Sequence, residues 1–62
     1  MNPLRRDVNE VLLGILGSEE FVQRWWTSDN AAFGFVPPQY VWDQGDEAQI
    51  EVANYVFTHG FK

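Results

Sequence analysis

Hydrophobic positions in the first part of the chain recur at the period of one helical face. Leucine, valine and isoleucine stand at steps of three and four residues, at Leu4, Val8, Val11, Leu12, Ile15 and Leu16. Asn2 can cap such a helix, and Pro3 suits its first position, where a missing N–H costs nothing. Gly17 suits the left-handed residue that ends a helix. We therefore predict a helix from Pro3 to near Gly17.

A second helix is predicted immediately afterwards. Ser18 can cap it, and the two glutamates that follow lie where the positive end of the helix dipole favours carboxylates. Short polar residues follow from Thr27 onward, and their side chains compete with the helix for hydrogen bonds to nearby backbone groups. We therefore expect the helix to end near Thr27. Its apolar stripe consists of Phe21, Val22, Trp25 and Trp26.

Two tryptophans are adjacent on this second helix. Neighbouring helical residues point about 100° apart, so one ring can enter the core while the other lies at its rim. We expect Trp25 to lie in the core. We expect Trp26 and Trp42 to be partly exposed, where an amphipathic ring can anchor a partner interface.

The segment from Ala31 to Pro38 shows no sustained period and reads as a structured connector. We expect its aromatic side chains, Phe33 and Phe35, to turn inward. The proline pair that closes the segment then presets the backbone for a short helix that runs through Trp42 and stops at Gly45.

The last predicted helix runs from about Glu47 to Thr58, with a start like a capping box at Asp46 and Gln49. Gly60 is expected to end it. Its apolar positions, Ile50, Val52, Ala53, Tyr55, Val56 and Phe57, cover much of the circumference. A helix with so wide an apolar face has two neighbours or a partner.

These elements predict an all-α fold, a small single domain over residues 1–62 with four helices, one of them short, and brief connectors. The chain has 62 residues, of which 45% are hydrophobic and 16% aromatic, and this composition excludes disorder. A core of this size is thin, so dense packing or a partner must support it.

The charge balance of the chain argues against nucleic acid as a partner. Nine acidic residues against four basic ones give a net charge of −5, and the basic residues are scattered along the chain. Direct binding to nucleic acid needs several clustered Lys or Arg residues and is therefore not expected. We see neither a signal peptide nor a membrane span, so we expect a cytoplasmic protein.

Candidate catalytic chemistry is sparse. The chain has no cysteine and a single histidine, His59, which cannot make a metal site alone. The acids Asp43, Asp46 and Glu47 do not follow the order of a calcium loop. No Ser or Thr stands in a nucleophile motif. We therefore expect no metal, no cofactor and no enzyme activity, and an interaction module is the better interpretation.

Six residues fall in the spacing W-x4-N-x3-G-x3-P-x6-G-x14-G, namely Trp25, Asn30, Gly34, Pro38, Gly45 and Gly60. In this spacing the chain resembles the toxin-binding domain of the Xre/MbcA/ParS antitoxin family. The preceding segment VLLGILGSEEF (residues 11–21) is similar to the opening helix of that family, so the resemblance spans nearly the whole chain. Phe33 stands for a family leucine, and Phe35 departs from a second glycine of the family pattern. The N-terminal helix-turn-helix domain usual in that family has no counterpart in this sequence.

The resemblance implies an antitoxin of a bacterial toxin–antitoxin pair. Family antitoxins bind RES-type toxins, which consume NAD, and neutralise them by covering the entrance to the active site. By this analogy the last helix and the tail would face the toxin, through Tyr55, His59, Phe61 and Lys62. Apolar and aromatic anchors there would supply most of the affinity.

A second interpretation explains the same apolar surface without a toxin. The chain would be a self-associating structural or assembly protein of bacterial or phage origin. A homodimer through the last helix would favour this alternative, because a thin core gains most from self-burial.

Overall fold

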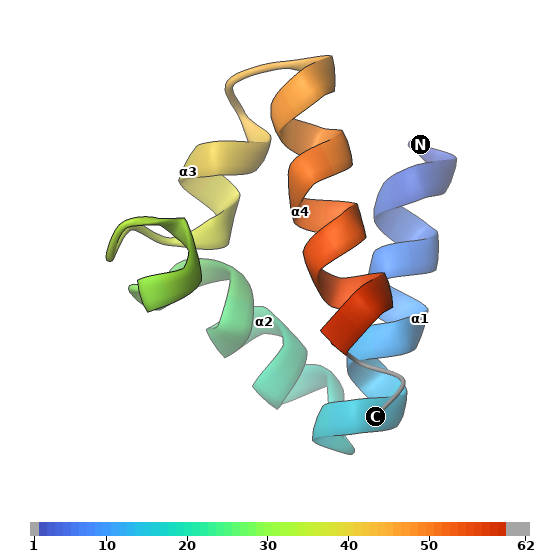
Figure 1. The fold of residues 1–62 in the computed structure, drawn as a ribbon. Helices are drawn as coiled ribbons and strands as arrows, with labels where there is room; N and C mark the ends of the chain where they lie inside the picture. The colour runs from blue at the N-terminus through green and yellow to red at the C-terminus, as the bar shows by residue number, and fades with distance from the viewer. Residues whose placement is uncertain (1, 60–62) are drawn as a thin grey trace.

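The computed structural model of the chain describes residues 2–59 and has the predicted all-α fold (Figure 1). The described residues form four α-helices, α1 (Pro3–Leu16), α2 (Glu19–Thr27), α3 (Pro38–Trp42) and α4 (Asp46–His59), with one 3₁₀ turn, η1 (Ala31–Phe33). They contain no strand beyond an isolated antiparallel bridge between Asn30 and Val36. None of the described helices is both long and apolar enough to cross a membrane.

The first two helices begin and end where the sequence predicts. The Asn2 side chain accepts a hydrogen bond from the backbone N–H of Leu4 at 2.9 Å. Gly17 ends α1 with a φ of 87° and donates its N–H to the carbonyl of Leu13. The Ser18 hydroxyl then accepts from the backbone N–H of Phe21 at 3.2 Å, which caps α2. The polar caps and the glycine stop are therefore confirmed.

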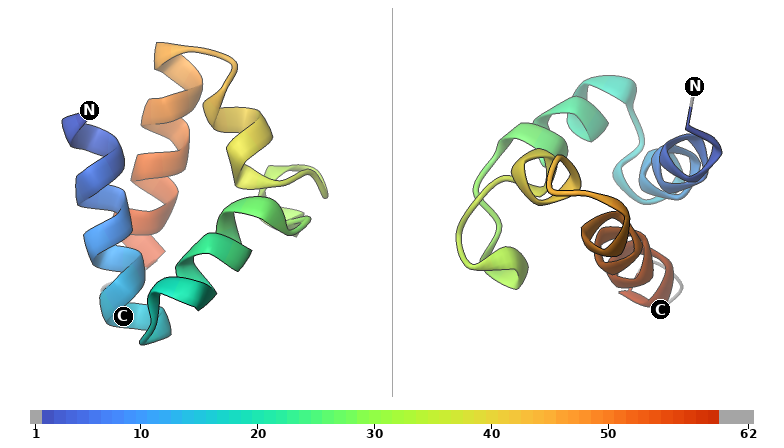
Figure 2. Two further views of the ribbon diagram at one scale, coloured as in Figure 1. Left: turned by 180° about the vertical axis from the view of Figure 1, so that it is seen from behind. Right: turned by 90° about the horizontal axis from the view of Figure 1, so that it is seen from above.

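The helices are arranged around a common core (Figure 2). α1 and α4 lie side by side, α2 starts beside the lower end of α1 and runs diagonally away from it toward α3, and α3 lies on the other side of α4. α1 packs against α2 and α4, and α3 packs against the same two helices. Each long helix therefore has two neighbours, which accounts for the wide apolar face of α4.

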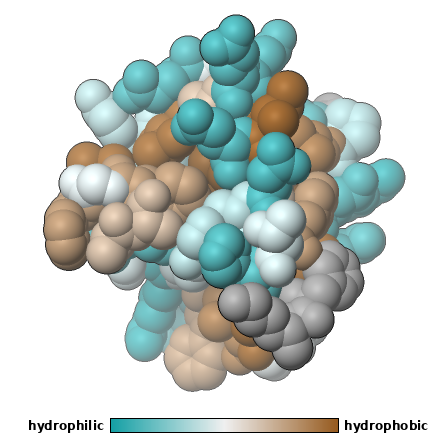
Figure 3. Space-filling model, viewed as in Figure 1, coloured by the Kyte–Doolittle hydropathy of each residue, from teal (hydrophilic) through white to brown (hydrophobic). Residues whose placement is uncertain are grey.

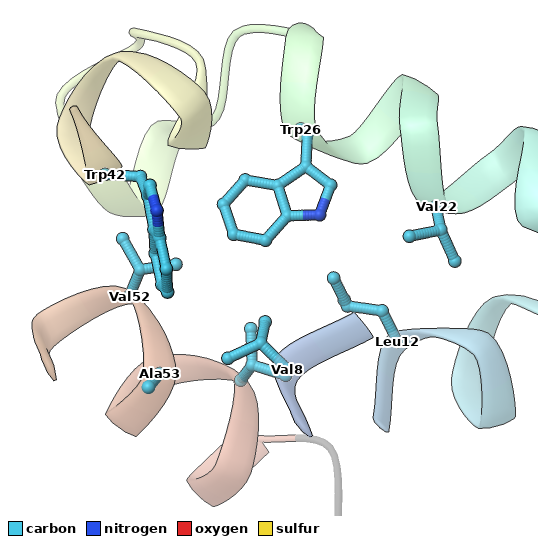
Figure 4. Packing of buried hydrophobic residues seen from close by; sticks show 8 residues of the cluster. Val8, Leu12, Val22, Trp26, Trp42, Val52 and Ala53 are labelled. Carbon is cyan, nitrogen blue, oxygen red and sulfur yellow. The ribbon is translucent and has the colours of Figure 1, made fainter. Parts of the chain in front are cut away.

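The buried core draws on all four α-helices (Figure 4). Val8 and Val52 have no exposed surface, and they lie beneath the rings of Trp26 and Trp42. The buried hydrophobic residues are Val8, Leu12, Val22, Trp26, Trp42, Val52, Ala53 and Val56.

The expected positions of the tryptophans are wrong. Trp26 is 1% exposed and Trp42 is 6% exposed, whereas Trp25 is only partly buried at the edge of the core. Trp26 shares its helical face with Val22, four residues earlier, and α2 packs against α1 and α3. Its ring meets Trp42 edge to face at 5.4 Å, and its Nε1 donates to Asn9 Oδ1 at 2.7 Å. The indole is thus buried with its polar group satisfied.

A cation covers these two indoles. The guanidinium of Arg5 lies 3.6 Å from the centre of the Trp26 ring and 5.3 Å from that of Trp42. It also donates to Gln39 Oε1 at 2.7 Å, which ties α1 to α3. Burial lowers the pKa of Arg5, and the nearby Asp43 carboxylate opposes that shift. Scattered basic residues in the sequence gave no sign of this arrangement.

The connector between α2 and α3 is a tight turn centred on Asn30. The Asn30 side chain accepts from the backbone N–H of Ala32 at 2.9 Å, and its carbonyl accepts from Phe33 and Phe35, both at 3.0 Å. Phe33 packs against the core as expected, but Phe35 is 73% exposed. The expectation that both aromatics turn inward is therefore wrong for Phe35, which follows Gly34 with a positive φ of 66°.

The last helix spans Asp46–His59, one residue more at each end than predicted. Gly45 precedes it with a φ of 128°, a conformation that favours glycine. The side chain of Gln49 donates to the Trp42 carbonyl at 3.2 Å and accepts from Asn2 at 3.1 Å. Gln49 thus joins α4 to α3 and α1 instead of completing the expected capping box. The predicted stop at Gly60 lies outside the described residues.

Candidate partner-binding site

Residues from the C-terminal parts of α1 and α4, together with Trp25 of α2, line a groove. It holds a volume of about 160 Å³. The described residues that line this groove are Leu12, Ile15, Leu16, Trp25, Tyr55, Val56 and His59.

The floor and the rim of the groove come from the same helical pattern that builds the core. Leu12 and Val56 are each 3% exposed, so they belong to both the core and the groove. Ile15 and Leu16 follow Leu12 by three and four residues, on the side of α1 toward its C-terminus. Ile15 is 50% exposed. The apolar stripe of α1 therefore continues from the core out to the surface.

Aromatic rings form one wall. Trp25 meets Phe33 edge to face at 6.3 Å, and Phe33 meets Tyr55 at 5.2 Å. Tyr55 in turn stacks on the ring of His59, with the ring centres 4.3 Å apart. Contacts of this kind stabilise aromatic pairs by about 0.5 to 1.5 kcal/mol beyond their buried area. The wall is thus held in place by α2, η1 and α4 together.

His59 is positioned by the end of its own helix. Its Nδ1 lies 2.9 Å from the Tyr55 carbonyl oxygen and 3.2 Å from the Thr58 hydroxyl. When Nδ1 carries the proton, it donates to that carbonyl. The same contact holds the ring against Tyr55, with an angle of 28° between the two ring planes.

A second hollow of about 290 Å³ continues the surface on the other side of Trp25. It shares Leu16 and Trp25 with the groove and adds Phe21, which is 49% exposed. In the space-filling view, a small area of hydrophobic residues is visible at the bottom of the molecule, beside hydrophilic ones (Figure 3). Exposed apolar patches of this kind mark interaction sites on small soluble domains.

The charge of the groove differs from that of the whole chain. The chain carries a net charge of −5, yet no carboxylate belongs to the described residues that line the groove. The closest charged residues of the neighbouring hollow are Arg24 and Asp29. Arg24 pairs with Glu20 on the outer face of α2 at 3.2 Å. The groove itself therefore carries no carboxylate, and the charged side chains Arg24 and Asp29 belong to the neighbouring hollow.

The predicted partner-binding residues have different locations. Tyr55 and His59 both line the groove, on consecutive turns of α4. Trp26 and Trp42 lie in the core, so neither is an exposed anchor. The remaining predicted contacts, Phe61 and Lys62, lie outside the described residues.

Sequence reasoning missed the contribution of α1 and of Trp25 to the groove. Leu12, Ile15 and Leu16 give a clear helical stripe, but a stripe does not show which part of it a neighbouring helix leaves uncovered. α2 has only nine residues and diverges from α1, so its stripe cannot cover the whole apolar face. A mismatch in length between neighbouring apolar helices is the signal that could have indicated a groove.

Between residues 2 and 59, no three His, Asp or Glu side chains gather closely enough to hold a metal ion. No protein-family model matches the chain, and neither a curated protein nor a solved structure shows significant similarity to it.

Proposed function

We propose that this chain is a non-catalytic protein-interaction module that binds an apolar segment of a protein partner in the groove. The observation that supports this function best is the groove itself, with an apolar floor and a fixed aromatic wall that ends in Tyr55 and His59. Rigid aromatic side chains around a central apolar pocket are typical of interface hot spots.

The dimensions of the groove suit one bulky side chain of the partner. An apolar cavity of about 150 Å³ accommodates a benzene ring, and the groove holds about 160 Å³. A phenylalanine, leucine or methionine side chain of the partner would fill it. The surrounding apolar surface, which includes Ile15 and Phe21, would exclude water from that contact.

We further propose that the partner is a RES-type, NAD-consuming toxin, which the module inhibits by occlusion as an antitoxin would. The resemblance to the Xre/MbcA/ParS family supports this partner, and so does the backbone at the residues that carry it. Gly34 and Gly45 both have a positive φ, and Phe35 has one where the family pattern has its second glycine. Pro38 is buried at the start of α3. Such an inhibitor would act in the cytoplasm.

Co-expression tests this function. The tagged chain is produced together with the product of the open reading frame adjacent to its gene, and growth, cellular NAD and co-purification are read together. Ile15→Glu places a charge at the rim of the groove. Ile50→Glu is its matched control, because Ile50 is 54% exposed on α4, away from the groove, against 50% for Ile15.

We expect the wild type and Ile50→Glu to restore growth, preserve NAD and co-purify with the toxin. Ile15→Glu should fold but lose all three effects. The proposal is contradicted if the toxin is not bound by the wild type, or if Ile15→Glu protects cells as well as Ile50→Glu does.

A further inference from the structure

Phe35 combines two features that are individually uncommon. Its backbone has a φ of 66°, in the left-handed region that bulky residues rarely adopt, and its side chain is 73% exposed. A phenylalanine this exposed gains little from packing, and glycine would adopt the same backbone without strain. Neither packing against the core nor the backbone conformation of the turn therefore explains why position 35 has an aromatic residue. Backbone strain of this kind is concentrated at functional sites.

The turn holds the Phe35 backbone in a fixed position. Its N–H donates to the Asn30 carbonyl at 3.0 Å, and the next residue, Val36, accepts from the Asn30 N–H at 3.2 Å. Gly34 is also left-handed, with a φ of 76°, and donates to the Ala31 carbonyl. The ring is thus presented to solvent from a hydrogen-bonded turn, which lowers the entropy cost of placing it in a binding pocket.

The distribution of charge limits which surface of another molecule can contact the turn that carries Phe35. Two copies of the chain repel each other, because each carries a net charge of −5. The segment Ala31–Pro38 contains no charged residue, and the described lining of the groove contains no carboxylate. These two surfaces can therefore meet without placing acid against acid. The volume of the groove, about 160 Å³, also matches one phenyl ring.

We propose that Phe35 inserts its ring into the groove of a second copy of this chain. The ring and the groove are different surfaces of one molecule, so the contact is head-to-tail and leaves one groove free at the end of each assembly. This inference uses the groove of the proposed function but needs no toxin. A second copy and a protein partner compete for the same groove. Without its partner, the chain would therefore self-associate, and the partner would bind by displacing the neighbouring copy from the groove.

Sedimentation of the purified full chain over a range of concentrations tests this contact. An interface with one anchor is small, so we expect a Kd between about 1 µM and about 1 mM. Phe35→Gly and Ile15→Glu should each weaken association by about tenfold or more. Ile50→Glu, the matched control, should associate as the wild type does. Phe35→Gly should also raise the melting temperature, because it relieves the backbone, so lost association cannot reflect unfolding.

Mixing the two variants gives a stricter test. The Phe35→Gly copy retains its groove, and the Ile15→Glu copy retains its ring, so the two should form a one-to-one complex although each alone is monomeric. The proposal is overturned if the wild type stays monomeric up to about 1 mM. Association that survives Phe35→Gly, or a mixture that remains monomeric, overturns it as well.

The same variants separate this inference from the proposed function. Phe35→Gly leaves the groove intact, so it should still protect cells in the co-expression experiment. Protection without self-association would overturn the inference and leave the proposed function standing. Self-association without protection would do the reverse.

Discussion

The two adjacent tryptophans of α2 lie in contrasting environments. Trp26 is enclosed by the core, capped by the Arg5 guanidinium and bonded to Asn9, whereas Trp25 lies at the margin and lines the groove. Their rings still touch, with centres 5.1 Å apart and planes at 87°. One step along a helix thus separates a side chain that stabilises the fold from one that faces the proposed partner.

The Trp26 side and the Trp25 side of α2 differ in how far neighbouring helices cover them. On the Trp26 side, α1, α3 and α4 supply apolar contacts together with hydrogen bonds from Arg5 and Gln49. On the Trp25 side, the short α2 leaves the ends of α1 and α4 uncovered. A small domain can therefore stabilise one end of its apolar layer and use the other end for binding.

Trp26→Ala should unfold the domain. Truncating a buried tryptophan costs about 3 to 5 kcal/mol. A domain of this length has a total stability on the order of 3 to 9 kcal/mol. Circular dichroism should show loss of the cooperative thermal transition. A transition like that of the wild type would mean that Trp26 is not a central part of the core.

Trp25→Ala should be tolerated. Trp25 is only partly buried, so we expect a loss of about 1 to 2 kcal/mol in the free energy of unfolding. Urea denaturation followed by circular dichroism should still give a single transition. If Trp25→Ala were as destabilising as Trp26→Ala, the two sides of α2 would not differ as described.

Arg5→Met should cost about 1 kcal/mol of stability, because it removes the charge over Trp26 and the hydrogen bond to Gln39 but keeps an unbranched apolar stem. Arg6→Met is the matched control. Arg6 is exposed in its pairing with Asp7 at 3.9 Å, so its replacement should change stability by less than about 0.5 kcal/mol. Equal effects of both variants in chemical denaturation would argue against a structural role for Arg5.

Phe35→Gly should have the smallest effect and the opposite sign. Relief of the left-handed backbone is worth about 1 to 2 kcal/mol, and the added freedom of glycine in the unfolded chain offsets part of that gain. A rise of up to about 1 kcal/mol in the free energy of unfolding is therefore expected. A decrease would show that the Phe35 side chain contributes to folding after all.

The sequence predicts the helices well because their signals are local. Asn2, Ser18 and Gly17 act on backbone groups within a few residues, and the apolar steps of three and four fix which residues share a face. These interactions do not depend on how the helices later pack. The all-α fold and the ends of the first two helices follow from them.

The tertiary arrangement depends on contacts that no local pattern contains. The assignment of Trp25 and Trp26 to core and rim depends on the angle between α2 and its neighbours, and the cation over Trp26 comes from a residue 21 positions earlier. Phe35 is exposed because a left-handed turn directs it outward, which an apolar pattern cannot reveal. The sequence predicts Tyr55 and His59 as partner contacts, and both line the groove, but its other walls come from α1 and α2.

The most direct measurement compares two variants of similar stability in the co-expression experiment. Trp25→Ala changes the groove and Arg5→Met changes the core, and both should remain folded in a thermal melt. We predict that Arg5→Met still restores growth and preserves NAD, whereas Trp25→Ala does not. Protection by Trp25→Ala, or loss of protection by a folded Arg5→Met chain, would contradict the assignment of binding to the groove side of α2.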